Sequence, residues 1–148
     1  MSLKKIAVTA ALLLSTLPSL SQARDTALFL PFDKVVAEAI RTGKIDGSVK
    51  FYLAGNKPAG NVTVVSPGAV TNKKTNAFNK SDEAACEWVL QSALISLHQA
   101  AKNAGANAVT NIVSFYKSNE RKDPTTYECH AGAIMAGVAL KGDLAKVQ

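Results

Sequence analysis

The chain has 148 residues, of which 47% are hydrophobic, and a formal net charge of +6. This length supports one domain with a buried core and leaves no room for a large multidomain enzyme. After the first 23 residues the sequence contains no second long apolar stretch, no internal repeat and no low-complexity tract.

The N-terminus, residues 1–23, has the pattern of a cleavable secretory signal peptide. Lys4 and Lys5 give it a positive start, and the run Ile6–Leu20 is predominantly apolar. Ser21–Ala23 places small residues where signal peptidase cleaves. The apolar run is shorter than the about 20 residues of a transmembrane helix, so we expect cleavage and not a membrane anchor. No cysteine lies near the cleavage site, which argues against a lipid-modified N-terminus.

Export places the mature chain, residues 24–148, in the periplasm. Loss of Lys4 and Lys5 lowers the net charge from +6 to +4. A mild positive charge favours anionic envelope surfaces weakly, and export removes nucleic acid from the expected partners. We therefore expect a periplasmic protein that does not span a membrane once its signal peptide is removed.

Residues 24–80 carry the patterns of a strand, a short helix and a hairpin. The predicted elements are a strand at Thr26–Leu30, a helix at Lys34–Arg41, and two hairpin strands at Ser48–Leu53 and Val62–Val70. Asp33 is the expected helix cap and Gly43 the expected stop. The polar, basic run Thr71–Lys80 is predicted to be a loop.

Residues 81–141 form the predicted core of this single domain. The expected elements are a long helix at Asp82–Ala104, a strand at Asn107–Tyr116, a charged hairpin tip at Lys117–Thr125 and a last strand at Tyr127–Leu140. Ser81 is the expected helix cap, and Gly105 ends the helix. An apolar stripe runs along the helix and must be buried. The pattern predicts an α+β fold, an antiparallel sheet with the long helix packed on one face.

Two cysteines, Cys86 and Cys129, favour one disulfide in an exported chain. Cys86 lies on the apolar stripe of the predicted long helix. Cys129 shares a face of the last predicted strand with Tyr127 and the small Ala131. The bond would join the helix to the sheet and contribute about 4 kcal/mol, because it closes a loop of roughly 44 residues in the unfolded chain.

A metal site is the main alternative use of these cysteines. Its candidate ligands are Cys86, Cys129, His98 and His130. His98 projects from the helix away from Cys86, and His130 points to the strand face opposite Cys129. The four groups do not converge as a soft metal requires, so we expect neither metal nor cofactor.

The usual catalytic motifs are missing from the sequence. Gly55–Gly60 has two glycines at the spacing of a phosphate-binding loop but lacks its lysine and hydroxyl, which favours a turn. No nucleophile elbow or zinc-protease helix motif is present. Glu128 and His130 share a strand face, and such a pair is usually structural. We expect no catalytic residues and a protein that is not an enzyme.

Two groups of side chains are candidates for a partner surface. Cations gather in two predicted loops, Lys73, Lys74 and Lys80 in one, and Lys117, Arg121 and Lys122 in the other. They form either a cationic patch or two solvated loops, and we favour the second interpretation. Trp88 and Ile95 lie one heptad apart on the helix, away from the core stripe. The N-terminal segment covers them in the favoured interpretation, and a partner does in the other.

The run Ala101–Thr110 and the strand end Gly137–Leu140 resemble the YbjQ-like and RcsF-like group of small α+β domains. The resemblance covers about residues 82–141. It implies a long helix on a short sheet, and a disulfide of the RcsF-like sensors would lie where Cys86 and Cys129 stand. Those sensors act through protein contacts. This chain has fewer cysteines and no lipid-attachment cysteine, so anchoring and stress signalling do not carry over.

The whole chain is also similar to uncharacterised exported proteobacterial proteins, some of which carry the label excinuclease ATPase subunit. The missing phosphate-binding loop argues against that label here. Compartment, missing catalytic motifs and the sensor-like half together predict a periplasmic, non-enzymatic domain that binds another envelope protein. The second hypothesis is a module that binds a metal or small ligand, and the third is an enzyme of unknown type.

Overall fold

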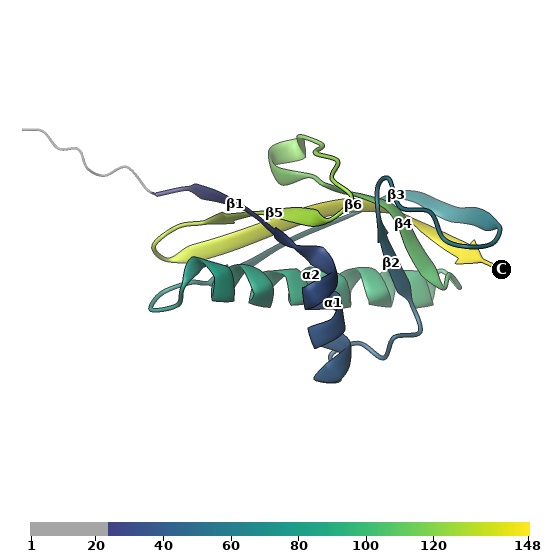
Figure 1. Ribbon diagram of the computed structural model, residues 1–148, viewed down its shortest axis with the longest axis horizontal. Coiled ribbons are helices and arrows are strands. Elements are labelled where there is room, and N and C mark those ends of the chain that lie inside the picture. The colour runs from purple at the N-terminus through teal and green to yellow at the C-terminus, as the bar shows by residue number, and fades with distance from the viewer. Residues whose placement is uncertain (1–23) are drawn as a thin grey trace, which may run out of the picture.

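The computed structural model describes residues 24–148 (Figure 1), and the predicted signal peptide lies outside the described residues. The described part contains, in order, β1 (Thr26–Pro31), α1 (Phe32–Arg41), β2 (Lys50–Leu53), β3 (Val62–Asn76), α2 (Asp82–Asn103), β4 (Ala108–Ser114), the short helix η1 (Tyr116–Ser118), β5 (Thr126–Ala131) and β6 (Met135–Val147). Six strands form one strongly curled sheet, and both α-helices lie on one side of it (Figure 1). The predicted α+β class is confirmed.

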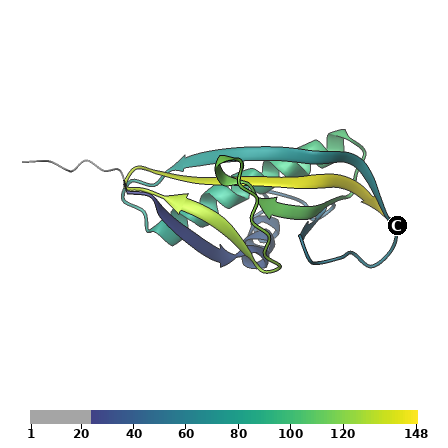
Figure 2. The same cartoon turned by 90° about the horizontal axis from the view of Figure 1, so that it is seen from above.

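Strand β6 is the centre of the sheet. One edge of β6 pairs antiparallel with β3, from Val62↔Val147 to Asn76↔Met135. The other edge pairs antiparallel with β5 near the start of β6 and with β4 near its end. β1 continues the sheet beyond β5, and β2 continues it beyond β4. Figure 2 shows β3 and β6 side by side along the length of the molecule.

The predicted hairpin between Ser48–Leu53 and Val62–Val70 does not form. β2 pairs with β4 in the parallel direction, so the sheet is mixed and the purely antiparallel prediction is wrong. β3 also continues to Asn76, through the first part of the predicted loop Thr71–Lys80, because β6 offers it a partner along its whole length. Backbone hydrogen bonds make this pairing whatever the polarity of the side chains, so the local pattern does not reveal it.

The predicted last strand, Tyr127–Leu140, is two strands. A turn at residues 132–134 separates β5 from β6, which pair with each other at His130↔Gly137. The run Lys117–Thr125 is therefore not the tip of a hairpin but part of the connection between β4 and β5, which are not neighbours in the sheet. Alanine and glycine fit strand and turn alike, so the sequence pattern hides this break.

Helix α2 carries the main hydrophobic core. Ser81 Oγ accepts a hydrogen bond from the backbone N–H of Ala84 at 3.1 Å, as a cap should, and the predicted helix is confirmed to within one residue. The buried apolar residues of α2 are Ala85, Cys86, Val89, Leu90, Ala93, Leu94, Leu97 and Ala101. The predicted disulfide is confirmed, because Cys86 is bonded to Cys129 of β5, with their Cα atoms 5.9 Å apart.

Helix α1 lies beside α2 and starts earlier than predicted, at the buried Phe32. Pro31 occupies its cap position, and Asp33, the predicted cap, lies inside the first turn. Lys34 of α1 forms an ion pair of 2.9 Å with Glu87 of α2. The face of the sheet opposite the two helices, called the open face below, is crossed by the β4–β5 connection (Figure 1). In residues 24–148, no helix is both long and apolar enough to span a membrane.

Candidate functional site

The candidate site lies on the open face, where three strands bring His130, Gly137 and Lys74 into one row. His130 of β5 is paired with Gly137 of β6, and Gly137 is paired with Lys74 of β3. Residues paired across neighbouring strands share a face of the sheet. Tyr127 and Cys129 of β5 point into the core, so His130 and its row point the other way.

Gly137 leaves a gap between the two polar side chains of this row. A Cβ atom built on Gly137 would meet no atom nearer than 3.6 Å, in ordinary van der Waals contact with Lys73 and Lys74. The fold therefore does not require glycine here for lack of space. The missing side chain instead leaves the backbone of β6 as the floor of a hollow.

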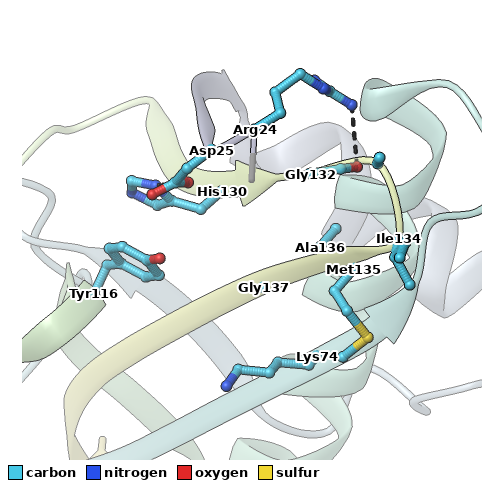
Figure 3. A pocket seen from close by; sticks show the side chains of 11 residues that line it. Arg24, Asp25, Lys74, Tyr116, His130, Gly132, Ile134, Met135, Ala136 and Gly137 are labelled. Atoms are coloured by element: carbon cyan, nitrogen blue, oxygen red, sulfur yellow. Dashed lines mark hydrogen bonds and ion pairs between the residues drawn. The ribbon is translucent and has the colours of Figure 1, made fainter. Parts of the chain in front are cut away.

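This hollow has a volume of about 410 Å³. Its lining residues are Arg24, Asp25, Lys74, Tyr116, His130, Gly132, Ala133, Ile134, Met135, Ala136 and Gly137. Figure 3 shows Tyr116 and His130 on one side, Met135 and Ile134 on the other, and Lys74 along the rim. Side chains of Ile134 and Met135 are 64% and 48% exposed, so one wall is apolar and accessible.

His130 is held by partners at both ring nitrogens. Its Nδ1 lies 2.8 Å from a carboxylate oxygen of Asp25, and its Nε2 lies 2.5 Å from one of Glu128. The ring also stacks on Tyr116, with centroids 3.4 Å apart and an angle of 9° between the planes. Because both nitrogens already contact carboxylates, the ring offers no free base to a molecule in the hollow.

Tyr116 reaches His130 because the β4–β5 connection, residues 115–125 and called the strap below, is anchored at several points. The backbone groups of Ser114 and Arg121 exchange hydrogen bonds of 3.0 and 2.9 Å. Ser114 Oγ accepts a hydrogen bond of 3.0 Å from the N–H of Glu128. The guanidinium of Arg121 lies 4.1 Å from the ring centroid of Phe29 in β1. The strap is thus tied to β5 and β1.

The strap also contains two left-handed residues that are not glycine. Lys117 has φ of 52° and Ser118 has φ of 63°. Such conformations are uncommon outside glycine, asparagine and aspartate. They reverse the chain directly after Tyr116, so the tyrosine ring stays over the sheet while the chain turns back.

Most charges around the hollow are neutralised within the chain. Arg24 binds both carboxylate oxygens of Asp82, at 2.8 and 3.0 Å, and donates to the carbonyl of Gly132 at 3.0 Å. Its hydrogen bond lowers the pKa of Asp82 below the ordinary value. Asp25 is paired with His130. Among the described residues that line the hollow, Lys74 is the charged group without an ion-pair partner.

The four side chains weighed as candidate metal ligands lie apart in the structure. The cystine leaves no thiolate at Cys86 or Cys129. His98 lies 3.5 Å from Asp46, on the helix side of the sheet. In residues 24–148 no three His, Cys, Asp or Glu side chains are placed to hold one ion, and the carboxylates at His130 contact opposite sides of its ring.

The predicted cations are spread over two faces. Lys73 and Lys74 lie in β3 and not in a loop, and consecutive strand residues point to opposite faces. Only Lys74 of this pair therefore lines the hollow. In the strap, Arg121 contacts Asp123 at 3.3 Å, while Lys117 and Lys122 are exposed.

Trp88 and Ile95, which the sequence offered either to cover by the N-terminal segment or to a partner, lie on α2, away from the hollow. Their side chains are 52% and 42% exposed. Trp88 borders a groove of about 380 Å³ between α1 and α2. The ammonium of Lys44 lies 3.8 Å from the centroid of the Trp88 ring, so the N-terminal segment covers this side chain in part.

Sequence reasoning missed Asp25, Tyr116 and Gly137 at this site. The pairing of Glu128 with His130 was visible from their spacing on one strand, but Asp25 and Tyr116 come from distant parts of the chain. Gly137 was part of a run of small residues that carried no sign of a hollow. No protein-family model, curated protein or solved structure matches this chain.

Proposed function

We propose that this protein is an exported, periplasmic, non-enzymatic domain that binds another envelope protein at the hollow on the open face. The observation that supports this proposal best is that most charged groups around the hollow are already paired within the chain. Both nitrogens of His130 are occupied, Asp25 and Arg24 are paired, and Lys74 alone of the lining charges lacks an ion-pair partner in residues 24–148. Such a site can recognise a group by charge and by apolar contact, while its histidine ring is already engaged by two carboxylates.

The lining defines the chemistry of the group that fits. Ile134 and Met135 offer apolar contact, the bare backbone at Gly137 admits a bulky group, and Lys74 favours a negative charge. The proposed ligand is therefore an apolar side chain that lies next to a carboxylate on a partner protein.

The disulfide and the family resemblance agree with this proposal. A disulfide between α2 and β5 suits an oxidising compartment such as the periplasm. The resemblance of residues 82–141 to RcsF-like sensors, which act through protein contacts, stays a prediction and points in the same direction. Neither enzymatic chemistry nor a thiolate metal site draws support from the hollow.

A small ligand is a second candidate because the hollow, at about 410 Å³, has the size of a small-molecule site. The lining would select a compact apolar acid by the same contacts. Native mass spectrometry of protein purified from the periplasm distinguishes the two, because only a retained small ligand adds mass to the isolated chain.

The experiment that tests the proposal fills the hollow from its floor. Gly137→Val places a side chain where a Cβ meets only ordinary contacts, and valine suits a strand. Thr63→Val, an exposed position at the far end of β3, is the matched control. A photo-crosslinking residue in place of Met135 should form a discrete adduct with an envelope protein in cells. We expect Gly137→Val to reduce that adduct at least about tenfold and Thr63→Val to leave it unchanged.

Two results would contradict the proposal. One is a crosslinker at position 135 that forms no adduct in the periplasm. The other is an adduct whose yield is the same with and without the valine at position 137, provided that thermal melting shows both variants to be folded.

A further inference from the structure

One end of the molecule exposes a pair of large apolar side chains, Phe78 and Ile134, called the apolar tip below. Phe78 lies in the β3–α2 connection and Ile134 in the β5–β6 turn, and they are 63% and 64% exposed. Figure 2 shows these two connections together at the end of the sheet opposite the C-terminus. Exposed apolar groups that gather in this way mark contacts with a protein or a membrane.

Hydrogen bonds hold the apolar tip in a defined shape. The N–H of the buried Ala77 donates to the carbonyl of Ile134 at 2.6 Å, which ties the two connections together. The N–H of Phe78 donates to the side-chain carbonyl of Asn76 at 2.7 Å. The turn that carries the aromatic ring is therefore ordered, and it directs the ring outward and not into the core.

Two cations without ion-pair partners, Lys74 and Lys80, lie near the apolar tip. Lys80 donates to the backbone carbonyl of Asn76 at 2.9 Å, and neither Lys80 nor Lys74 forms an ion pair within residues 24–148. The acids nearby are largely engaged, since Asp82 is bound by Arg24 and Asp25 by His130. The charge of Glu83, in the first turn of α2, raises the pKa of Lys34 in α1 and of Tyr127. Glu83 therefore lies on the side of α2 that faces α1.

The chain enters the described part of the fold at this same end. Arg24 donates to the carbonyl of Gly132, in the turn that carries Ile134. In the sequence, residues 21–23 alone separate Arg24 from the apolar run Ile6–Leu20. A precursor that is still bound to the membrane through this run would therefore hold the apolar tip toward the bilayer.

We propose that the apolar tip docks on an anionic lipid bilayer. Phe78 and Ile134 enter the boundary between headgroups and acyl chains, while Lys74 and Lys80 contact lipid phosphates. An aromatic ring and an aliphatic side chain with lysines around them match such a surface in both polarity and charge. The docking is peripheral and reversible. Ile134 and Lys74 also line the hollow, so the bilayer and a partner protein would compete for these two side chains.

Vesicle sedimentation of protein purified from the periplasm tests this assignment. The probes are vesicles of phosphatidylcholine alone and vesicles that also contain about 30% phosphatidylglycerol. We expect the protein to sediment with the anionic vesicles, and to be released when added salt screens the charges. The double variant Phe78→Ser/Ile134→Ser should lower the partition coefficient at least about tenfold.

Matched controls distinguish binding through the apolar tip from non-specific adsorption to vesicles. Val62→Ser removes an exposed apolar side chain, 42% exposed, at the opposite end of β3 and should leave binding unchanged. Lys80→Glu should abolish binding to anionic vesicles, whereas Lys146→Glu, paired with Thr63 far from the apolar tip, should weaken it only slightly. Lys80 lies on the surface, so Lys80→Glu should fold. This variant keeps the proposal testable if the double serine variant fails to fold.

The proposal fails if the wild-type protein does not sediment with anionic vesicles at low salt, or if the tip variants and Val62→Ser bind equally well. A further contradicting result is that vesicles bind neither the wild type nor the double serine variant, while the variant loses a protein adduct that the wild type forms. The apolar tip would then be part of a protein interface. Gly137→Val should not affect sedimentation, so the failure of either proposal can be recognised separately.

Discussion

At the scale of single residues, His130 organises the open face. It is 14% exposed and lies between two carboxylates, of which Glu128 is 15% exposed. Burial of a carboxylate is costly unless a donor satisfies it, so Glu128 depends on this ring, whereas Asp25 is 49% exposed and is also solvated. The same ring supports Tyr116, so one side chain links Asp25, which directly precedes β1, to β5 and the strap.

Replacement of His130 by phenylalanine should separate its stacking from its hydrogen bonds. Phenylalanine keeps a flat ring against Tyr116 but leaves Asp25 and Glu128 without their shared donor. We expect a loss of about 2–3 kcal/mol in the free energy of unfolding, measured by urea denaturation. Adding Glu128→Gln to this variant should recover part of the loss, because the buried negative charge is gone. Equal stability of His130→Phe and wild type would show that the hydrogen bonds contribute nothing.

At the scale of elements, the strap is the least regular part of the fold that helps to form the site. Asp123 gives it a fixed end next to β5. One oxygen of Asp123 accepts hydrogen bonds from the N–H groups of Thr125 and Thr126, at 2.9 and 2.8 Å. These backbone hydrogen bonds lower the pKa of Asp123 from 3.8 to about 2. The ionised carboxylate thus stabilises the turn that starts β5.

A lowered pKa predicts the sign of a pH effect. Because Asp123 binds its proton less readily in the folded state, its stabilising contribution is complete above pH 3.8 and is lost as the pH falls toward about 2. Asp123→Asn should therefore be less stable than wild type at neutral pH, and the difference should shrink across this window. Thermal melting of both proteins at several pH values measures this difference in stability. The contributions of the other carboxylates cancel, because both proteins contain them. A difference that does not change with pH would contradict the assignment.

Strands were the elements that the sequence predicted least well. Helix α2 has a cap, a periodic stripe and a stop, all of them local, and its bounds were predicted almost correctly. β2 and β3 were predicted as strands but given each other as partners. Strand pairing is decided by which edge is free and long enough, and those edges belong to β4 and β6, far along the chain.

At the scale of the whole molecule, the cystine links the two layers of the fold. Cys86 lies in the first half of α2 and Cys129 lies in β5, with a sequence separation of 43. Both side chains are fully buried in the core. The bond therefore holds the start of α2 against the strand that carries His130 on its other face.

Removal of this bond should destabilise the protein strongly. For the double variant Cys86→Ala/Cys129→Ala we expect a loss of about 4 kcal/mol in the free energy of unfolding, because the unfolded chain regains the freedom of the opened loop. Urea denaturation of the oxidised wild type and the variant measures the difference. The wild type with its disulfide reduced is the control, and it should fall close to the variant. A loss below about 1 kcal/mol would mean that the bond adds little to the packed core.

The sequence by itself determined the helices, the α+β class and the disulfide, because each depends on neighbours along the chain or on simple counting. The signal peptide and the periplasmic compartment are predictions of the same local kind. Only the tertiary structure decided the mixed pairing of the sheet, the split of the last predicted strand and the hollow around Gly137. The hollow joins residues 24 and 25, 74, 116, 130 and 132–137, and strand register brings these together. Register arises from the packing of the whole sheet, which no local pattern contains.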